Sequence, residues 1–324
     1  MDTPLSLEAF AAGFPHNAAL REQIIYLLGG ATRAPSTHNS QPWRFRVENG
    51  LLEVHPDTRL RLPQSDGKGR YACVSNGFLL HHIGVLGRYF GMQPDMEVHA
   101  DGAPLATVRL SRAGELQESE RALASAVFRR RNRRGLFESS HPLPPGPHTT
   151  LEAPAPYCPP GIRSTTPSVV TDRTVVKRIG DLTKETMMRL YARPAFRREM
   201  AGWITPTGSR RVDGIPGYSL NQPRILSWIL PSVIRHVNIG NIVGSVSAAA
   251  IASAPALIAF GGDESPKTWL GIGFQASHDI LSLVSEGFDA SVFVASAELP
   301  DLRAEATKLC GLSEPLQFLF AALR

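Results

Sequence analysis

A run of uncharged polar side chains lies between two prolines near the N-terminus. Pro35 and Pro42 enclose Ser36-Thr37-His38-Asn39-Ser40-Gln41, and Trp43 follows. The prolines fix two backbone angles, and short polar side chains beside the end of a helix can converge with backbone N–H groups on a ligand. Such a rigid, donor-rich loop suits a planar heteroaromatic ligand with many hydrogen-bonding edges. The alternative is an ordinary turn that closes a helix.

A second candidate for ligand binding is the arginine run at residues 129–134, which reads Arg-Arg-Arg-Asn-Arg-Arg. Guanidinium groups make planar, bidentate and permanently charged contacts with phosphate. Several of them within one turn can neutralise a dianion. The alternatives are a solvated basic end of a helix, where the charges interact favourably with the helix dipole, and a contact with nucleic acid.

Apolar periodicity and turn signals place both segments at the ends of helices. The polar loop follows a helix expected at 17–32 and precedes a strand expected at 43–48, and the arginines end a helix expected at 118–131. Hairpins are expected around Asn49-Gly50 and Asp101-Gly102. The remaining expected elements are helices at 69–91, 172–192, 194–204, 266–287 and 299–310, and strands at 256–261, 290–296 and 316–323. This mixture of helices and hairpin-linked strands predicts an α+β fold.

The composition argues against several classes of protein. A chain of 324 residues with 43% hydrophobic composition can bury a sizeable core. Cys73, Cys158 and Cys310 are widely separated and odd in number, so we expect neither a disulfide framework nor a zinc site, and a reducing, cytoplasmic compartment. We expect no secretory signal, because the first residues show no basic region followed by an apolar stretch. We expect no membrane span, because the most apolar stretch, 245–260, is short.

The net charge of +5 invites a nucleic-acid interpretation, but much of the excess lies in the arginine run. No aromatic stacking platform or DNA-reading motif accompanies that run, so we expect no nucleic-acid partner. His81 and His82 are adjacent on the apolar helix 69–91 and cannot both face one metal. They are interpreted as core or interface residues, and no metal site is predicted.

The polar loop closely resembles the flavin-contacting loop of the nitroreductase superfamily, whose pattern is Ala-Pro-Ser-x-x-Asn-x-Gln-Pro-Trp. Residues 34–43 fill every fixed position of this pattern without a gap. The segment 129–137 resembles the arginine motif of the same family. Arg130, Arg131 and Arg134 take the arginine positions, Asn132 stands where Ser or Thr is usual, and Phe137 takes the aromatic position.

The two motifs occur in the reverse of the usual order, which resembles the internally duplicated, single-chain (Acg-like) branch of the superfamily. In that branch each half of the chain keeps one motif, and the halves form a pseudo-dimer. The resemblance implies nitroreductase-like halves at 1–140 and 169–324, a Pro-rich connection at 141–168, and an insert at 205–243. The insert is expected to be a lid, with a dimer contact as the alternative. One flavin per chain is expected, in a monomer or a homodimer.

The resemblance further implies an FMN-dependent oxidoreductase that takes a hydride from NAD(P)H at flavin N5. The acceptor would be a nitroaromatic, a quinone or another small molecule. The flavin would carry the chemistry while the protein supplies orientation, so no catalytic residue is predicted. The expected cofactor contacts are Pro35, Ser36, Thr37, His38, Asn39, Gln41, Arg130, Arg131, Asn132, Arg134 and Ser296.

Two other functions fit the same resemblance. One is a storage protein with an occluded FMN and no turnover, and the other is a specialised biosynthetic flavin-dependent oxidase or dehydrogenase. The final strand departs from the family pattern, because Ala321 stands where an arginine that helps to hold the flavin phosphate is usual. Either Arg324 replaces that arginine or one phosphate contact is missing.

Overall fold

The computed structural model describes residues 5–48, 50–99, 102–112, 114–137, 151, 154–163, 165–220 and 223–323. Asn49, Asp101, Arg324 and much of the expected Pro-rich connection lie outside the described residues. The statements below concern the described part of the chain.

The first half of the chain forms a four-stranded antiparallel sheet in the order β1-β2-β4-β3. Its strands are β1 (Trp43–Glu48), β2 (Leu51–Pro56), β3 (Met92–Val98) and β4 (Ala106–Arg112). Buried and exposed positions alternate along β3, as expected for a sheet with one face on the core. The accompanying helices are α1 (Leu7–Ala11), α2 (Leu20–Ala31), α3 (Arg70–Tyr89) and α4 (Glu118–Arg129), with short 3₁₀ helices η1 (Thr37–Asn39) and η2 (Thr58–Leu60).

The second half forms another four-stranded antiparallel sheet, in the order β5-β8-β10-β9. Its strands are β5 (Ser168–Val170), β8 (Ala256–Gly261), β9 (Asp289–Val292) and β10 (Leu316–Leu323). Every residue of β10 is buried, because alternate side chains enter two hydrophobic clusters on opposite faces of the sheet. The helices are α6 (Arg173–Tyr191), α7 (Pro194–Trp203), α8 (Arg224–His236), α9 (Gly240–Ser253), α10 (Pro266–Ser285) and α11 (Pro300–Leu309), with η3 (Gly217–Leu220) and η4 (Ala295–Ala297).

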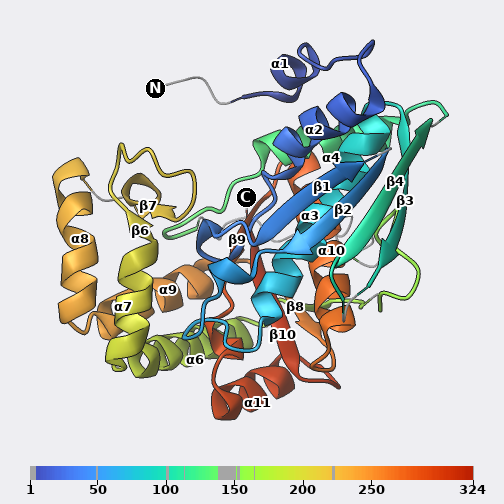
Figure 1. Cartoon of the computed structure of the whole chain (residues 1–324). Coiled ribbons are helices and arrows are strands. Elements are labelled where there is room, and N and C mark those ends of the chain that lie inside the picture. The colour runs from blue at the N-terminus through green and yellow to red at the C-terminus, as the bar shows by residue number, and fades with distance from the viewer. Residues whose placement is uncertain are drawn as a thin grey trace.

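Helices α3 and α10 join the two halves by packing against each other through glycines. A Cβ atom at Gly77 would lie 2.2 Å from the carbonyl oxygen of Leu270, and one at Gly273 would lie 2.0 Å from that of Val74. No side chain fits in these positions, so glycine is required for the close approach. Figure 1 shows the two long helices between the sheets, where they are buried along most of their length.

The expected insert contains a small parallel pair of strands, β6 (Ile204–Thr205) and β7 (Ile215–Pro216), and then α8. Figure 1 shows these elements at one side of the molecule, away from the first sheet. Helix α9 instead packs closely on α6, because Gly180, Gly240 and Gly244 each bring their backbone against the neighbouring helix.

The expected α+β fold is confirmed, and most expected elements agree with the observed ones to within a few residues. The helix expected at 118–131 ends earlier, at Arg129, and Arg130 has an extended ψ of 131°. The strand expected at 290–296 ends at Val292 and is followed by η4. The expected core positions of His81 and His82 are confirmed, since both side chains are fully buried. Among the described helices, none combines the length and the hydropathy that crossing a bilayer requires.

Candidate functional site

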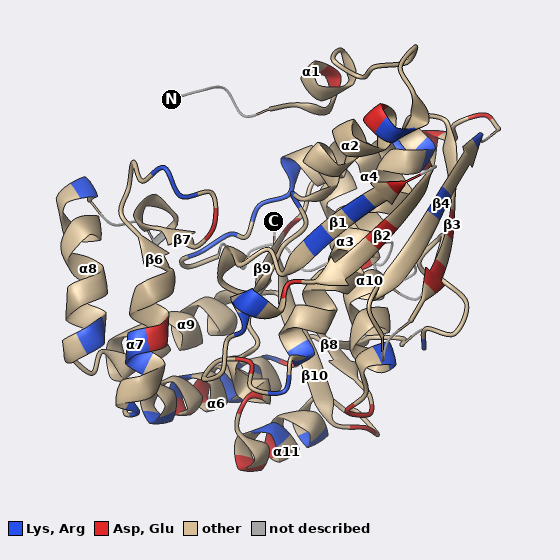
Figure 2. Cartoon of the chain, in the orientation of Figure 1, with Lys and Arg blue, Asp and Glu red and all other residues tan. Residues whose placement is uncertain are grey.

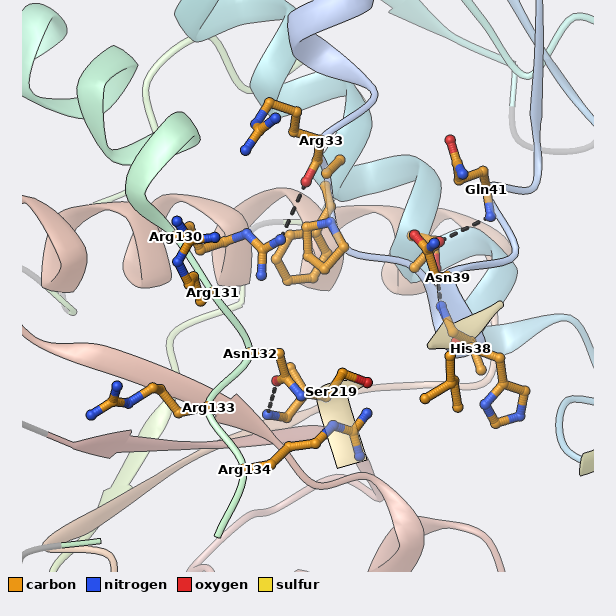
Figure 3. A pocket seen from close by; sticks show the side chains of 18 of the residues that line it. Arg33, His38, Asn39, Gln41, Arg130, Arg131, Asn132, Arg133, Arg134 and Ser219 are labelled. Carbon is orange, nitrogen blue, oxygen red and sulfur yellow. Dashed lines mark hydrogen bonds between the residues drawn. The ribbon is translucent and has the colours of Figure 1, made fainter. Parts of the chain in front are cut away.

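The polar loop and the arginine segment line one large cavity, although about 90 residues separate them in the sequence. The cavity has a volume of about 1170 Å³. Figure 3 shows the loop on one side of it and the arginines on the other. Of the expected contacts, Pro35, Ser36, Thr37, His38, Asn39, Gln41, Arg130, Arg131, Asn132 and Arg134 all line this cavity. The uncharged polar loop and the arginine segment therefore lie around the same cavity.

The polar loop adopts a backbone conformation that is rare for residues other than glycine. His38, Asn39 and Gln41 have φ values of 54°, 54° and 51°. Each costs on the order of 1–3 kcal/mol, less for Asn, and persists only where the surroundings hold it. Ser36 helps to stabilise this backbone conformation, because its Oγ accepts a 2.9 Å hydrogen bond from the backbone N–H of Gln41. The loop is therefore held open toward the cavity at an energetic cost, a common property of ligand-binding segments.

The arginine segment is extended and runs beside β9 of the second half. Asn132 forms a parallel bridge with Ala290, and its Oδ1 accepts a 2.9 Å hydrogen bond from the N–H of Val292. The hydroxyl of Ser291 donates to the carbonyl of Arg133 at 2.5 Å. Asn132 therefore positions the segment through its side chain, and Figure 2 shows the basic stretch that follows α4 running toward the insert.

Most arginines of the cavity have no acidic partner. Among the described residues, Arg33, Arg130, Arg131 and Arg134 make no ion pair with a carboxylate, whereas Arg133 pairs with Asp289 at 3.1 Å. Burial, and then the charges of Arg33 and Arg131, lower the pKa of Arg130 to about 10. Gathered like charges without carboxylates favour an anionic ligand.

Arg134 lies apart from this group, toward the polar loop and α6. Figure 3 shows its side chain directed away from Arg130 and Arg131. Burial, followed by the charge of Arg134, lowers the pKa of His38 to about 4, so His38 is neutral at physiological pH. Loss of contact with solvent lowers the pKa of Arg134, and the electrostatic interaction with Tyr191 acts in the opposite direction. The side chain of Arg134 is nevertheless exposed, because it borders the open cavity.

The insert contacts the polar loop through the carbonyl of Val212. This oxygen accepts hydrogen bonds from Asn39 Nδ2 at 3.0 Å and from Gln41 Nε2 at 3.1 Å. The backbone N–H of Gly214 donates to the carbonyl of Asn39 at 3.3 Å. Six residues of the insert line the cavity: Val212, Gly214, Ile215, Pro216, Tyr218 and Ser219. The insert thus forms one wall of the cavity.

Two expected features lie elsewhere. Ser296 is fully buried in η4 and does not line the cavity, and its Oγ finds no hydrogen-bond partner in the described part of the chain. Ala321 is fully buried in β10, pairs with Leu257 and Ser291, and does not line the cavity. Leu323, two residues later, reaches the cavity wall.

Sequence reasoning missed several polar residues of the cavity wall, among them Arg33, Tyr71 and Ser75. Arg33 follows α2, where a basic residue is ordinarily explained by the helix dipole. Tyr71 and Ser75 belong to α3, which was interpreted as an apolar core helix. The spacing of four between Tyr71 and Ser75, one helical turn, could have indicated a polar stripe on that helix.

No protein-family model matches the chain. Two proteins of Mycobacterium tuberculosis (strain ATCC 25618 / H37Rv) are similar to it in part. "Putative NAD(P)H nitroreductase Rv3131" is 36% identical over 131 residues, and "Putative NAD(P)H nitroreductase acg" is 35% identical over 110 residues. These matches cover 39% and 33% of this chain and 37% and 33% of the relatives, so the chain matches only about a third of each relative's length.

Solved structures give weaker likenesses. A "putative nitroreductase from anabaena variabilis atcc 29413" aligns over 100% of this chain and 92% of its own, with 10% identity and a TM-score of 0.41. The "FMN and NADPH-dependent nitroreductase NfnB from sphigopyxis sp. strain HMH" aligns over 62% and 87%, with 16% identity and a TM-score of 0.38. The likeness to nitroreductases therefore rests on the sequence matches, which agree with the resemblance that the two motifs carry. Over about a third of its length, this chain is similar to the Acg-like putative NAD(P)H nitroreductases of Mycobacterium tuberculosis.

Proposed function

We propose that this protein is an FMN-dependent oxidoreductase of the nitroreductase type. The observation that carries the proposal is the cavity in which a donor-rich, uncharged loop faces Arg130, Arg131 and Arg134, which pair with no carboxylate among the described residues. NAD(P)H would be the electron donor, and a nitroaromatic, a quinone or a similar small molecule would be the acceptor. The named relatives support this reaction class through the region they share with the chain.

The residues present fit FMN. A phosphate dianion suits Arg130 and Arg131, whose charges no described carboxylate neutralises, and the Nε of Arg130 is buried without a partner. The polar loop offers the amide groups of Asn39 and Gln41 and a neutral His38, which suit the hydrogen-bonding edge of a flavin ring. A volume of about 1170 Å³ exceeds that of most small-ligand cavities and leaves room for a second substrate.

When bound, FMN supplies hydride transfer, and the protein supplies binding, orientation and electrostatics. Arg134, beside the loop, adds a positive charge at the opposite end of the cavity from Arg33 and stabilises negative charge placed there. We propose that the insert acts as a lid over that end, because the carbonyl of Val212 contacts both Asn39 and Gln41 there.

We further propose that the chain consists of two nitroreductase-like halves, at 1–140 and 169–324, that share one flavin. The first half contributes the polar loop, and the arginine segment at its end crosses to β9 of the second half. Each motif occurs once in the sequence, so one chain holds one complete site.

Anaerobic mixing of the FMN-loaded protein with NADH or NADPH tests the proposed reaction. Rapid bleaching of the flavin absorbance, followed by its return on addition of a nitroaromatic or a quinone, is expected. Absence of bleaching, with reduction by dithionite intact, would support the storage function instead. The observation that favours storage is the hydrogen-bonded contact of Val212 with the loop, which could bar nicotinamide from a bound flavin.

A further inference from the structure

Arg33 belongs to neither of the two motifs, yet its side chain lies in the same cavity. It follows α2 immediately before the polar loop, and its guanidinium lies 5.2 Å from the centroid of the Phe128 ring. Phe128 belongs to the last turn of α4, directly before the arginine segment. Figure 3 shows the side chain of Arg33 on the side of the cavity where Arg130 and Arg131 also lie.

Three like charges are held together at this end. Arg130 Nη2 donates a 3.2 Å hydrogen bond to the carbonyl of Arg33, so the two backbone segments are tied to each other. The Nε atoms of both side chains are buried, and no described residue forms a hydrogen bond with either of them. Burial, and then the charge of Arg131, lower the pKa of Arg33, as expected for neighbouring cations in a partly desolvated site.

This arrangement costs free energy in the empty protein, because gathered cations repel one another and buried donors lose their contacts with water. Elsewhere in the chain, arginines are relieved of such costs by carboxylates, as Arg133 is by Asp289. No described carboxylate serves Arg33, Arg130 or Arg131 in this way. A ligand with two negative charges and several acceptor oxygens would satisfy all three groups.

We propose that Arg33 is a third phosphate-binding residue, outside the arginine segment, and that it helps to select phosphorylated over unphosphorylated flavin. This inference rests on the proposed function for the identity of the ligand. The underlying anion site, a phosphomonoester dianion held by Arg33, Arg130 and Arg131, stands on the geometry alone. Arg33 thereby ties the α2 end of the polar loop to the phosphate end of the cavity.

The test compares the wild type with Arg33→Gln, Arg33→Lys and a matched control, Arg21→Gln. Arg21 is an exposed arginine on α2 that does not line this cavity. Fluorescence titration of the apoproteins with FMN and with riboflavin gives the discrimination between the two ligands. Arg33→Gln should weaken FMN binding by about 10- to 100-fold and riboflavin binding by less than about threefold. Arg33→Lys should have an intermediate FMN affinity, because lysine keeps the positive charge but cannot form the two parallel hydrogen bonds of a guanidinium with phosphate.

A second readout uses inorganic phosphate, which requires no flavin. Phosphate should raise the melting temperature of the wild type and of Arg21→Gln, and should raise that of Arg33→Gln distinctly less. The unliganded Arg33→Gln variant should melt no lower than the wild type, because a repulsion is removed. Equal FMN affinities and equal phosphate responses for Arg33→Gln and Arg21→Gln would overturn the inference. A wild type that responds to phosphate through Arg33 and binds no FMN would instead overturn the proposed function.

Discussion

The contact between the insert and the polar loop yields a prediction whose size follows from the structure. The carbonyl of Val212 accepts hydrogen bonds from the side chains of Asn39 and Gln41. Each neutral, exposed hydrogen bond stabilises the closed arrangement by about 0.5–1.5 kcal/mol net. Removing both should therefore favour opening by about 1–3 kcal/mol, which corresponds to about a 5- to 150-fold larger open population.

The double variant Asn39→Gly/Gln41→Met removes both amide donors. Glycine tolerates the φ of 54° at position 39. At position 41, Gln and Met are strained to a similar degree by the φ of 51°, so this substitution does not change the backbone strain. The assay is hydrogen exchange of backbone amides at residues 212–219 in the apoprotein, where the loss of a flavin contact cannot contribute. Hydrogen exchange in this segment should become about 5- to 150-fold faster, whereas the exchange rates of the amides in β8 and α10 should not change.

Ser219→Ala is the matched control, because Ser219 lines the cavity but its Oγ donates to Pro216 within the insert. The control should exchange at residues 212–215 as the wild type does. If the double variant exchanges no faster there than Ser219→Ala, the bonds to Val212 do not hold the insert closed. The lid role proposed for this segment would then lose its structural basis.

Three further predictions concern the site and the fold. Arg130→Gln should weaken FMN binding by about 10- to 150-fold and leave riboflavin nearly unaffected, whereas Arg134→Gln, at the loop end of the cavity, should weaken both ligands by similar factors in the same titration. Burial, opposed by Arg70, raises the pKa of Glu298 to about 7 from 4.5; the stability linked to its proton is complete below pH 4.5 and is lost as the pH rises through 7. In urea unfolding across this pH range, the Glu298→Gln variant should therefore gain stability relative to the wild type as the pH rises. A difference in the free energy of unfolding that does not change with pH would contradict the raised pKa of Glu298. Gly77→Ala should lower the free energy of unfolding by about 1–3 kcal/mol or more, because its Cβ would lie 2.2 Å from a carbonyl oxygen of α10. Gly202→Ala, in α7 with nothing within 4 Å of the added Cβ, should leave the free energy of unfolding unchanged or raise it by up to about 1 kcal/mol.

The elements with strong local signals could be predicted from the sequence. Helix α3 has a long apolar pattern that ends at Gly91, which adopts a φ of 74°, and β10 is a continuous apolar run. The ends of elements were less predictable. Arg130 has a helix-compatible sequence around it, but pairing of the next residues with β9 draws the backbone into an extended conformation.

The candidate site was predictable where a motif carried it and not elsewhere. The loop and the arginine segment could be identified because each is contiguous in the sequence. The bond from Asn39 to Val212 joins residues 173 positions apart, and no local periodicity reports such a contact. Arg33 likewise becomes informative only when its neighbours Arg130 and Phe128 are known from the tertiary structure.

Titration of the apoprotein with FMN, followed by the absorbance and fluorescence of the flavin, measures whether the two motifs form one flavin site. We expect saturable binding at one FMN per chain, with the yellow colour retained after gel filtration and with riboflavin bound more weakly. Failure to bind FMN would contradict the claim that the polar loop and the arginines form one flavin site. Saturation at two FMN per chain would contradict the claim that each half contributes only one of the two motifs.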